Sequence, residues 1–199
     1  MKAIGLTGNI GCGKSTVASL LAKYPDVEII DCDKISKEII LGNKLRHEIN
    51  YILGVNVFPG GKADLKHIAE IIFKLPQKRK QLEKLIHPLV WATVQEKVRA
   101  AKEGTICIVE SAIIYETKSE SLFSAIIVTT CDQKEQVRRL KENRKMNDAD
   151  IQARLGQQIP SSEKKRRAQF VIDTDCHLSL LEDRVDRLYR EIKQQKGKQ

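Results

Sequence analysis

Short apolar runs alternate along the chain with longer segments that mix apolar and charged positions. The apolar runs predict buried strands over about 2–7, 27–31, 106–110, 125–130 and 169–173. The mixed segments predict amphipathic helices over about 14–24, 33–41, 64–74, 78–102, 132–145, 148–157 and 177–194. Strands that alternate with helices are typical of an α/β fold with a parallel sheet. Ligands of such sheets gather at the carboxyl ends of the strands, so the residues just past each strand are the candidates for chemistry.

The spacing of these elements predicts one core with two inserted parts. The interval from the second to the third strand is too long for a single crossover, and a turn at Phe58-Pro59-Gly60-Gly61 divides it. We expect residues 35–103 to form a helical substrate-binding insertion. A second, basic and helical stretch over 138–160 lies between the fourth and fifth strands. In phosphoryl-transfer enzymes this is a natural place for a closing lid, and we expect the stretch to form one. The core would then comprise 1–34, 104–137 and 161–199.

A glycine-rich segment between the first predicted strand and helix fits the pattern G-x-x-x-x-G-K-[ST]. It reads Gly8-Asn9-Ile10-Gly11-Cys12-Gly13-Lys14-Ser15, and Thr16 follows in the helix. In such a loop the backbone N–H groups and the helix start bind the phosphates of a nucleoside triphosphate. Lys14 is predicted to neutralise the β- and γ-phosphates, and the Ser15 hydroxyl to bind Mg²⁺. The helix start and Lys14 should also favour the thiolate of Cys12.

The composition favours a small anionic ligand over other classes of partner. The chain has 35 Lys and Arg against 26 Asp and Glu, a formal net charge of +9, which suits a polyanion. Its few aromatic residues do not interleave with a basic run, so we expect no nucleic-acid partner. We expect neither a signal peptide nor a membrane span. Five widely spaced cysteines, odd in number, fit buried or free thiols in a reducing cytosol better than a disulfide framework. We therefore expect a soluble, cytoplasmic protein, and we also expect a monomer.

Three predicted strand ends carry candidate residues. Asp33 follows the second strand, where a carboxylate could accept the proton of an acceptor hydroxyl or cap the next helix. Glu110 ends the third strand and could hold Mg²⁺ or a water of its shell. Ile113 and Tyr115 after it are expected to line a pocket, and Glu116 could equally lie on the surface.

Two further features lie within predicted helices. His87 precedes Pro88 inside a long helical pattern, where proline should kink or break the helix, and His87 has either a structural or a functional role. A basic cluster falls near the end of the helix that follows the fourth strand and in the predicted lid. Arginine beside a triphosphate stabilises charge in the transferring group. The cluster comprises Arg138, Arg139, Arg144 and Arg154.

Taken together, these motifs resemble those of the dephospho-coenzyme A kinase family over essentially the whole chain. The resemblance rests on residues 4–15, 30–35, 85–90, 154–158, 163–164 and 170–173. It implies a three-layer P-loop NTPase fold with a five-stranded parallel sheet of order 2-3-1-4-5, a helical coenzyme-binding part and a lid. It also implies transfer of the ATP γ-phosphate to the ribose 3′-hydroxyl of dephospho-coenzyme A, the last step of coenzyme A synthesis.

The resemblance assigns roles to several of the candidates. Asp33 would be the general base and His87 a residue of the substrate site. The lid arginine is assigned to Arg144, because the position counted from Arg139 falls on Asn143, one residue before it; Arg139 and Arg144 are both expected to act on the transferring phosphoryl group. The chain departs from the family pattern at Leu65, Ala112 and Thr174; Thr174 occupies an asparagine position near the adenine.

Two alternatives stay open from the sequence. One is another P-loop kinase of a small acceptor, such as a nucleotide or a sugar. The other is a regulatory NTPase, although the guanine-reading Asn-Lys-x-Asp motif is missing from the sequence.

Overall fold

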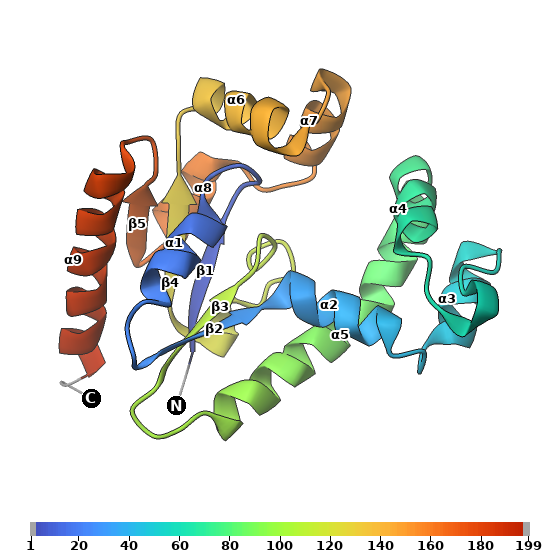
Figure 1. Ribbon diagram of the computed structural model, residues 1–199, viewed down its shortest axis with the longest axis horizontal. Helices are drawn as coiled ribbons and strands as arrows, with labels where there is room; N and C mark the ends of the chain where they lie inside the picture. Colours follow the sequence, from blue (N-terminus) through green and yellow to red (C-terminus); the bar gives the residue numbers. More distant parts are fainter. Residues whose placement is uncertain (1–2, 197–199) are drawn as a thin grey trace. The chain divides into compact units, whose positions relative to one another are not determined.

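The structure, a computed structural model, describes residues 3–196 (Figure 1). The strands of the described chain are β1 (Ala3–Gly8), β2 (Val27–Asp31), β3 (Ile106–Glu110), β4 (Phe123–Thr130) and β5 (Phe170–Asp173). Its first helices are α1 (Lys14–Leu21), α2 (Cys32–Leu41), α3 (Arg46–Leu53), α4 (Leu65–Lys74) and α5 (Pro76–Ala100). The later ones are α6 (Gln133–Arg144), α7 (Asp148–Leu155), α8 (Ser161–Arg167) and α9 (Leu178–Lys196). Two short 3₁₀ turns are η1 (Pro59–Gly61) and η2 (Glu120–Leu122).

The five strands form one sheet of order β2-β3-β1-β4-β5, which confirms the predicted order. β1 pairs in parallel with β3 and with β4, and β4 pairs in parallel with β5. Leu6 is level with Glu110, Gly8 with Thr129, and Thr130 with Asp173. The segments that follow β1, β3, β4 and β5 therefore leave the sheet at the same edge.

The chain divides into two compact units, residues 1–30 with 101–199, and residues 31–100. In the first unit, α1 and α9 pack against each other beside the sheet. α9 buries one stripe at helical spacing, Leu181, Val185, Leu188 and Ile192. Burying a large aliphatic side chain contributes about 1.5–3 kcal/mol, so this stripe is what holds the helix. The basic residues of α9 lie outside the stripe and form its polar face.

The second unit is built around the long helix α5, against which α2, α3 and α4 pack. α5 continues through Pro88, so the expected break does not occur. Proline removes the hydrogen bond to the carbonyl four residues earlier, which belongs to the exposed Lys84, where water can replace the bond. Buried residues on both sides of Pro88 hold the helix together. They are Leu82, Ile86, Val90 and Val94.

Two helices were not expected from the sequence, α3 and α8. Each is short, with eight and seven residues respectively. Segments of that length have little helical stability of their own, so tertiary contacts decide whether they form. Within residues 3–196, no helix is both long and apolar enough to cross a membrane.

Candidate active site

The glycine-rich loop runs from the end of β1 to the start of α1, in a conformation that requires glycine at two positions. Gly13 has φ 73°, and a Cβ there would lie 2.9 Å from the Thr174 Oγ1 atom. A Cβ on Gly8 would lie 2.5 Å from the Thr129 carbonyl oxygen. A side chain at either position would therefore push the loop away from the strand ends beside it.

Lys14 folds back over this loop. Its Nζ donates to the carbonyl oxygens of Gly8, at 2.9 Å, and Asn9, at 3.3 Å. Ser15 and Thr16 follow as exposed residues of the first turn of α1. The first turn holds no acidic residue, so the positive end of the helix and the ammonium group act together on an anion.

Ser15 is joined to Glu110 at the end of β3. The Ser15 Oγ donates to Glu110 Oε1 at 2.9 Å. Hydroxyl and carboxylate oxygens are the ligands that Mg²⁺ takes, with water and phosphate oxygens completing its shell. Within the described chain no cluster of three or more His, Cys, Asp or Glu could hold a metal. A magnesium ion with few protein ligands fits the Ser15–Glu110 pair.

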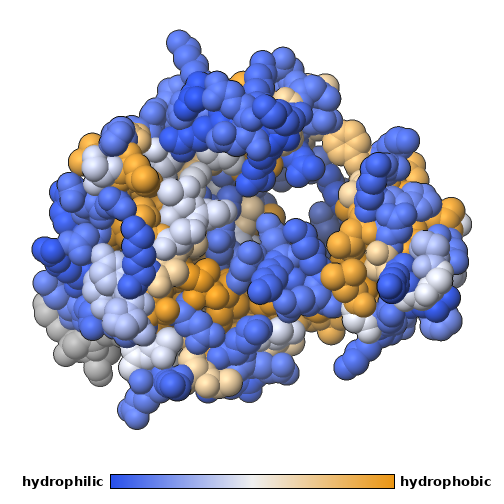
Figure 2. All heavy atoms as spheres, viewed as in Figure 1, coloured by the Kyte–Doolittle hydropathy of each residue, from blue (hydrophilic) through white to orange (hydrophobic). Residues whose placement is uncertain are grey.

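Two glutamine side chains fix the middle of the loop. Gln136 of α6 donates from Nε2 to the Ile10 carbonyl at 2.6 Å, and Gln158 Oε1 accepts from the Ile10 N–H at 2.9 Å. Gln136 lies in α6 and Gln158 in the segment that follows α7; Figure 2 shows the surface of these two helices as mainly hydrophilic. Sequence reasoning missed Gln136, because one amide in a charged helix gives no signal.

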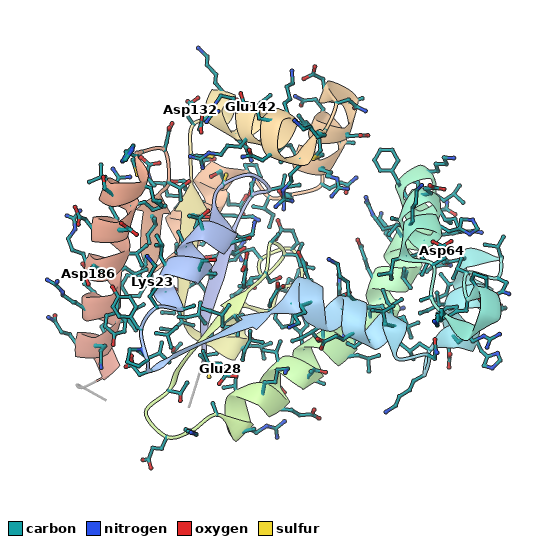
Figure 3. All side chains as sticks on the ribbon, in the orientation of Figure 1. Lys23, Glu28, Asp64, Asp132, Glu142 and Asp186 are labelled. Carbon is teal, nitrogen blue, oxygen red and sulfur yellow. The ribbon has the colours of Figure 1, made fainter. Side chains whose placement is uncertain are left out.

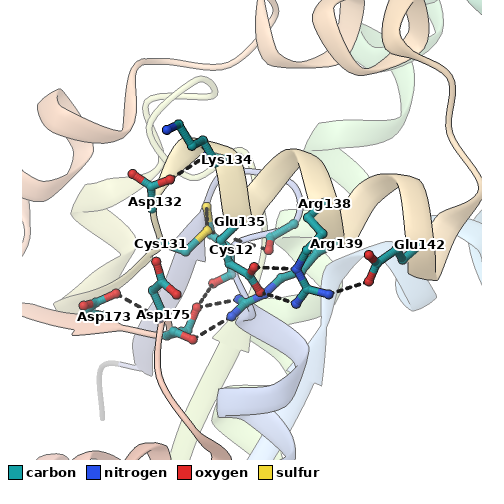
Figure 4. A network of polar contacts seen from close by, with 12 residues as sticks. Cys12, Cys131, Asp132, Lys134, Glu135, Arg138, Arg139, Glu142, Asp173 and Asp175 are labelled. Atoms are coloured by element: carbon teal, nitrogen blue, oxygen red, sulfur yellow. Dashed lines mark hydrogen bonds and ion pairs between the residues drawn. The ribbon is translucent and has the colours of Figure 1, made fainter.

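Arg139 lies beside the loop through its contact with Thr174. Its guanidinium donates to Glu135 at 2.7 Å, to Thr174 Oγ1 at 2.9 Å and to the Thr174 carbonyl at 2.7 Å (Figure 4). The hydrogen bonds from Arg138 and Arg139 lower the pKa of Glu135 to about 2. Thr174, expected near the adenine, thus packs against Gly13 of the phosphate loop.

The other arginines of the predicted cluster lie further out. Arg138 is exposed in the middle of α6 and pairs with Glu135 and Glu142. Arg144 is the exposed last residue of that helix, and Arg154 is exposed in α7. Figure 3 shows the two ends of α6, with Asp132 at its start and Glu142 towards its end. Asp132 caps the helix by accepting from the Lys134 N–H at 2.7 Å.

A buried ion pair holds the segment that follows β3. Lys164 of α8 is 0% exposed, and its Nζ lies 2.8 Å from Glu116 Oε1 and 2.9 Å from the Ala112 carbonyl oxygen. Burial lowers the pKa of Lys164, an effect that Glu116 opposes. Glu116 also accepts from the Ile159 N–H at 2.9 Å. Neither residue is therefore a solvated surface charge.

Tyr115 does line a pocket, but not beside the phosphate loop. The pocket has a volume of about 310 Å³ and includes Phe123, Ser124 and Arg167. Phe123 is level with Ala3, at the amino ends of β4 and β1. The segment from β3 to β4 runs back along the sheet from one edge to the other, which carries Tyr115 away from the strand ends. Ile113, earlier in the segment, is half-buried.

In the second unit, Asp31 caps α2. Its carboxylate accepts from the backbone N–H groups of Asp33, at 2.8 Å, and Lys34, at 3.1 Å. The expectation that Asp33 might be the cap is wrong, because the helix begins one residue before it; Asp33 is exposed in the first turn. His87 is half-buried in α5, and burial lowers its pKa. Leu65 begins α4 after the capping residue Asp64.

The loop, Lys14 and the Ser15–Glu110 pair lie at the carboxyl ends of the strands of a parallel sheet of order 2-3-1-4-5. A strand, a glycine-rich loop and a helix in this order form a phosphate-binding site. This fold and this site define a P-loop protein that binds a nucleoside triphosphate.

Comparison with known proteins gives the family. The family model for dephospho-CoA kinase matches residues 2–179. The chain belongs to the dephospho-CoA kinase family. It is similar to a dephospho-CoA kinase of Gloeobacter violaceus, with 37% identity over 94% of this chain and 90% of that protein.

Two solved structures extend the similarity to the fold. A Thermus thermophilus protein superposes with a TM-score of 0.80 at 28% identity, covering 96% of this chain and 97% of that one. A dephospho-CoA kinase from Campylobacter jejuni gives 0.68 at 26%, with 96% and 97% covered. The prediction of an ATP-dependent kinase for dephospho-coenzyme A, in coenzyme A biosynthesis, is confirmed at the level of the family.

Proposed function

We propose that this chain transfers the γ-phosphate of ATP to the ribose 3′-hydroxyl of dephospho-coenzyme A, the last step of coenzyme A synthesis. The observation that carries the proposal is the phosphate loop with its Lys14 and Ser15–Glu110 contacts, in a chain of this family. Phosphoryl transfer needs little covalent chemistry from the protein. Its residues instead position the two substrates and stabilise charge.

The loop and its neighbours bind the triphosphate in this proposal. Backbone N–H groups of the loop and of the first turn of α1, together with the Lys14 ammonium, hold the phosphate oxygens. The N–H groups of Ile10 and Cys12 are not among them, because they donate to Gln158 and to the Asn9 carbonyl. Ser15, with Glu110, holds Mg²⁺, which neutralises charge on the β- and γ-phosphates when bound. Arg139 fixes Thr174 against Gly13 and so keeps the loop in its binding conformation.

Asp33 is proposed as the general base that takes the proton of the 3′-hydroxyl. It follows β2, whose strand neighbour β3 ends at Glu110. Its carboxylate is exposed, and the helix it belongs to is already capped by Asp31. Asp33 is therefore available for a role that α2 itself does not require.

The remaining assignments concern the second substrate and the lid. We propose residues 35–103 as the part that binds the coenzyme, with His87 in its site. Ile113, just past the end of β3, is proposed as a further substrate-binding residue. Tyr115 is not included, because the pocket that it lines lies at the amino ends of β1 and β4. We propose 138–160 as the lid, with Arg144 or Arg139 reaching the transferring phosphoryl group on closure.

We also propose a cytoplasmic, monomeric enzyme without a nucleic-acid partner. None of the five cysteines, all within residues 3–196, forms a disulfide, which suits a reducing compartment. Light scattering of the purified chain checks the oligomeric state.

The function is tested by incubating the protein with ATP, Mg²⁺ and either dephospho-coenzyme A or a panel of nucleoside monophosphates. We expect turnover of dephospho-coenzyme A alone, and ³¹P NMR of the product should show a 3′-phosphomonoester. Turnover of a nucleotide without turnover of dephospho-coenzyme A would contradict the proposal and favour the nucleotide-kinase alternative.

The base is tested by Asp33→Asn, with Asp31→Asn as its matched control. Asparagine caps a helix about as well as aspartate, so neither variant should change the melting temperature. Removing a general base costs about 10²–10⁴ in rate. We expect that loss in kcat for Asp33→Asn only. A comparable loss in Asp31→Asn alone would move the role to Asp31.

A further inference from the structure

Two cysteine sulfurs lie in contact beside the phosphate loop. The Sγ atoms of Cys12 and Cys131 are 3.3 Å apart (Figure 4). Cys12 is 1% exposed within the loop, and Cys131 is partly exposed just after β4. Cys131 also lies 3.9 Å from the Gly11 carbonyl oxygen. The loop and the segment that leads into α6 therefore meet through a thiol pair 119 positions apart in the sequence.

We propose that Cys12 and Cys131 are an oxidative modification site, at which hydrogen peroxide forms a reversible disulfide that blocks ATP binding. The proposal rests on the proposed function only in the assignment of ATP to the loop. Formation of the bond itself depends on the two sulfurs and the oxidant alone.

The geometry requires only a small movement. A disulfide has an S–S distance of about 2.05 Å, so the sulfurs must approach by about 1.2 Å from 3.3 Å. Cys12 stands between Gly11 and Gly13, both with positive φ, and glycine tolerates changes of backbone conformation that other residues resist. The adjustment can therefore occur in the loop without disturbing the sheet.

The charges around the pair favour the first chemical step. The hydrogen bond from Cys131 lowers the pKa of Cys12 to about 7, with Lys14 and Arg139 contributing and burial opposing. The same hydrogen bond raises the pKa of Cys131, which burial raises further. Cys12 is thus the sulfur of the pair that ionises first, while Cys131 keeps its proton. The thiolate is the nucleophilic form.

The reaction balances with one peroxide molecule. The Cys12 thiolate attacks a peroxide oxygen, the O–O bond breaks, and Cys12 becomes a sulfenic acid while hydroxide leaves and is protonated to water. The Cys131 sulfur then loses its proton and attacks the Cys12 sulfur, releasing a second water. Two thiols are oxidised to one disulfide, and one peroxide is reduced to two waters. Peroxide is close to water in size, and the partly exposed Cys131 brings the pair to the protein surface.

The bond would act on the loop that binds phosphate. Cys12 is two residues from Lys14, and the backbone N–H groups on either side of it point at the nucleotide in a loop of this kind. Drawing Cys12 towards Cys131 changes their direction. ATP binding should therefore weaken, and reduction of the disulfide should restore it.

The test uses the intact protein treated with hydrogen peroxide, then with dithiothreitol. We expect an intact mass lower by two hydrogen atoms, a cross-linked peptide that joins Cys12 and Cys131, and binding of a fluorescent ATP analogue weaker by about tenfold or more. Dithiothreitol should reverse all three. Cys131→Ser should keep its basal ATP binding and lose this response, while the matched control Cys176→Ser should respond as the wild type.

Each contrary outcome overturns the proposal. Oxygen added to Cys12 without a cross-link would show that the two sulfurs do not join. A cross-link with unchanged ATP binding would remove the effect on the loop. If peroxide weakened ATP binding by Cys131→Ser reversibly and as fast as in the wild type, another thiol would be responsible. Should Cys131→Ser fail to fold, the cross-link and ATP binding of the wild type still decide. If the protein bound ATP but did not phosphorylate dephospho-coenzyme A, the proposed function would be contradicted, and the proposal for the Cys12–Cys131 pair would still hold.

Discussion

Replacing Lys164 by methionine should destabilise the protein far more than its place in the basic run 164–167 suggests. The side chain is 0% exposed and contacts both Glu116 and the Ala112 carbonyl oxygen. Without it, the Glu116 carboxylate keeps the Ile159 N–H as a donor, and the Ala112 carbonyl loses its lysine donor. Removing one partner of a buried ion pair costs about 3–5 kcal/mol.

The lower end of that range applies here, because the Glu116 side chain is 16% exposed and water can reach it. For a chain of this size, 1 kcal/mol shifts the melting temperature by about 2–4 °C. A loss of about 3 kcal/mol should therefore lower the melting temperature by about 6–12 °C.

Differential scanning calorimetry measures the effect, and Lys165→Met is the matched control, since Lys165 is exposed in the same helix. Lys165→Met should melt within about 2 °C of the wild type, as is usual for surface changes. The double variant Lys164→Met/Glu116→Leu should recover only part of the loss: it removes the unpaired carboxylate, but the Ala112 carbonyl and the Ile159 N–H lose these partners. A Lys164→Met protein as stable as the control would refute this account of the pair.

Two further predictions concern the phosphate site. Gly13→Ala should weaken ATP binding, measured by calorimetry. Alanine in the left-handed backbone conformation costs about 1–2 kcal/mol, and the added Cβ would lie 2.9 Å from the Thr174 Oγ1 atom. The control Gly104→Ala has a similar φ of 87° in open space and should leave ATP binding unchanged. Arg139→Ala should lower kcat about tenfold or more, because its guanidinium places positive charge near the transferring phosphate. The control Arg138→Ala loses only surface ion pairs and should keep a kcat near that of the wild type. Equal kcat values in the two variants would refute the role of Arg139.

The phosphate loop and the sheet could be predicted from the sequence, because their signals are local. The glycines, Lys14 and Ser15 follow one another within one strand–loop–helix unit. All five strands are apolar runs bounded by turns or helices. Their order came with the family resemblance, and the observed sheet confirms it.

Local pattern failed where a contact elsewhere in the molecule decided the role of a residue. Lys164 sits in a run of four basic residues, yet it is fully buried, because a carboxylate and a carbonyl 48 and 52 positions earlier face it. Asp31 rather than Asp33 caps α2, because the helix starts directly at the strand end. The pattern of apolar residues does not predict the first residue of a helix to within one or two positions.

The sequence by itself determined that this chain folds as an α/β P-loop protein with a phosphate site at its first strand, since hydrophobic period and glycine spacing are properties of neighbouring residues. The tertiary structure alone decided which side chains from distant parts of the chain lie beside that site. Gln136, Cys131 and Thr174 reach the loop from 126, 119 and 162 positions away. Such contacts form only when the parallel strands bring their carboxyl ends to one edge, and no pattern along the chain encodes which residues will meet there.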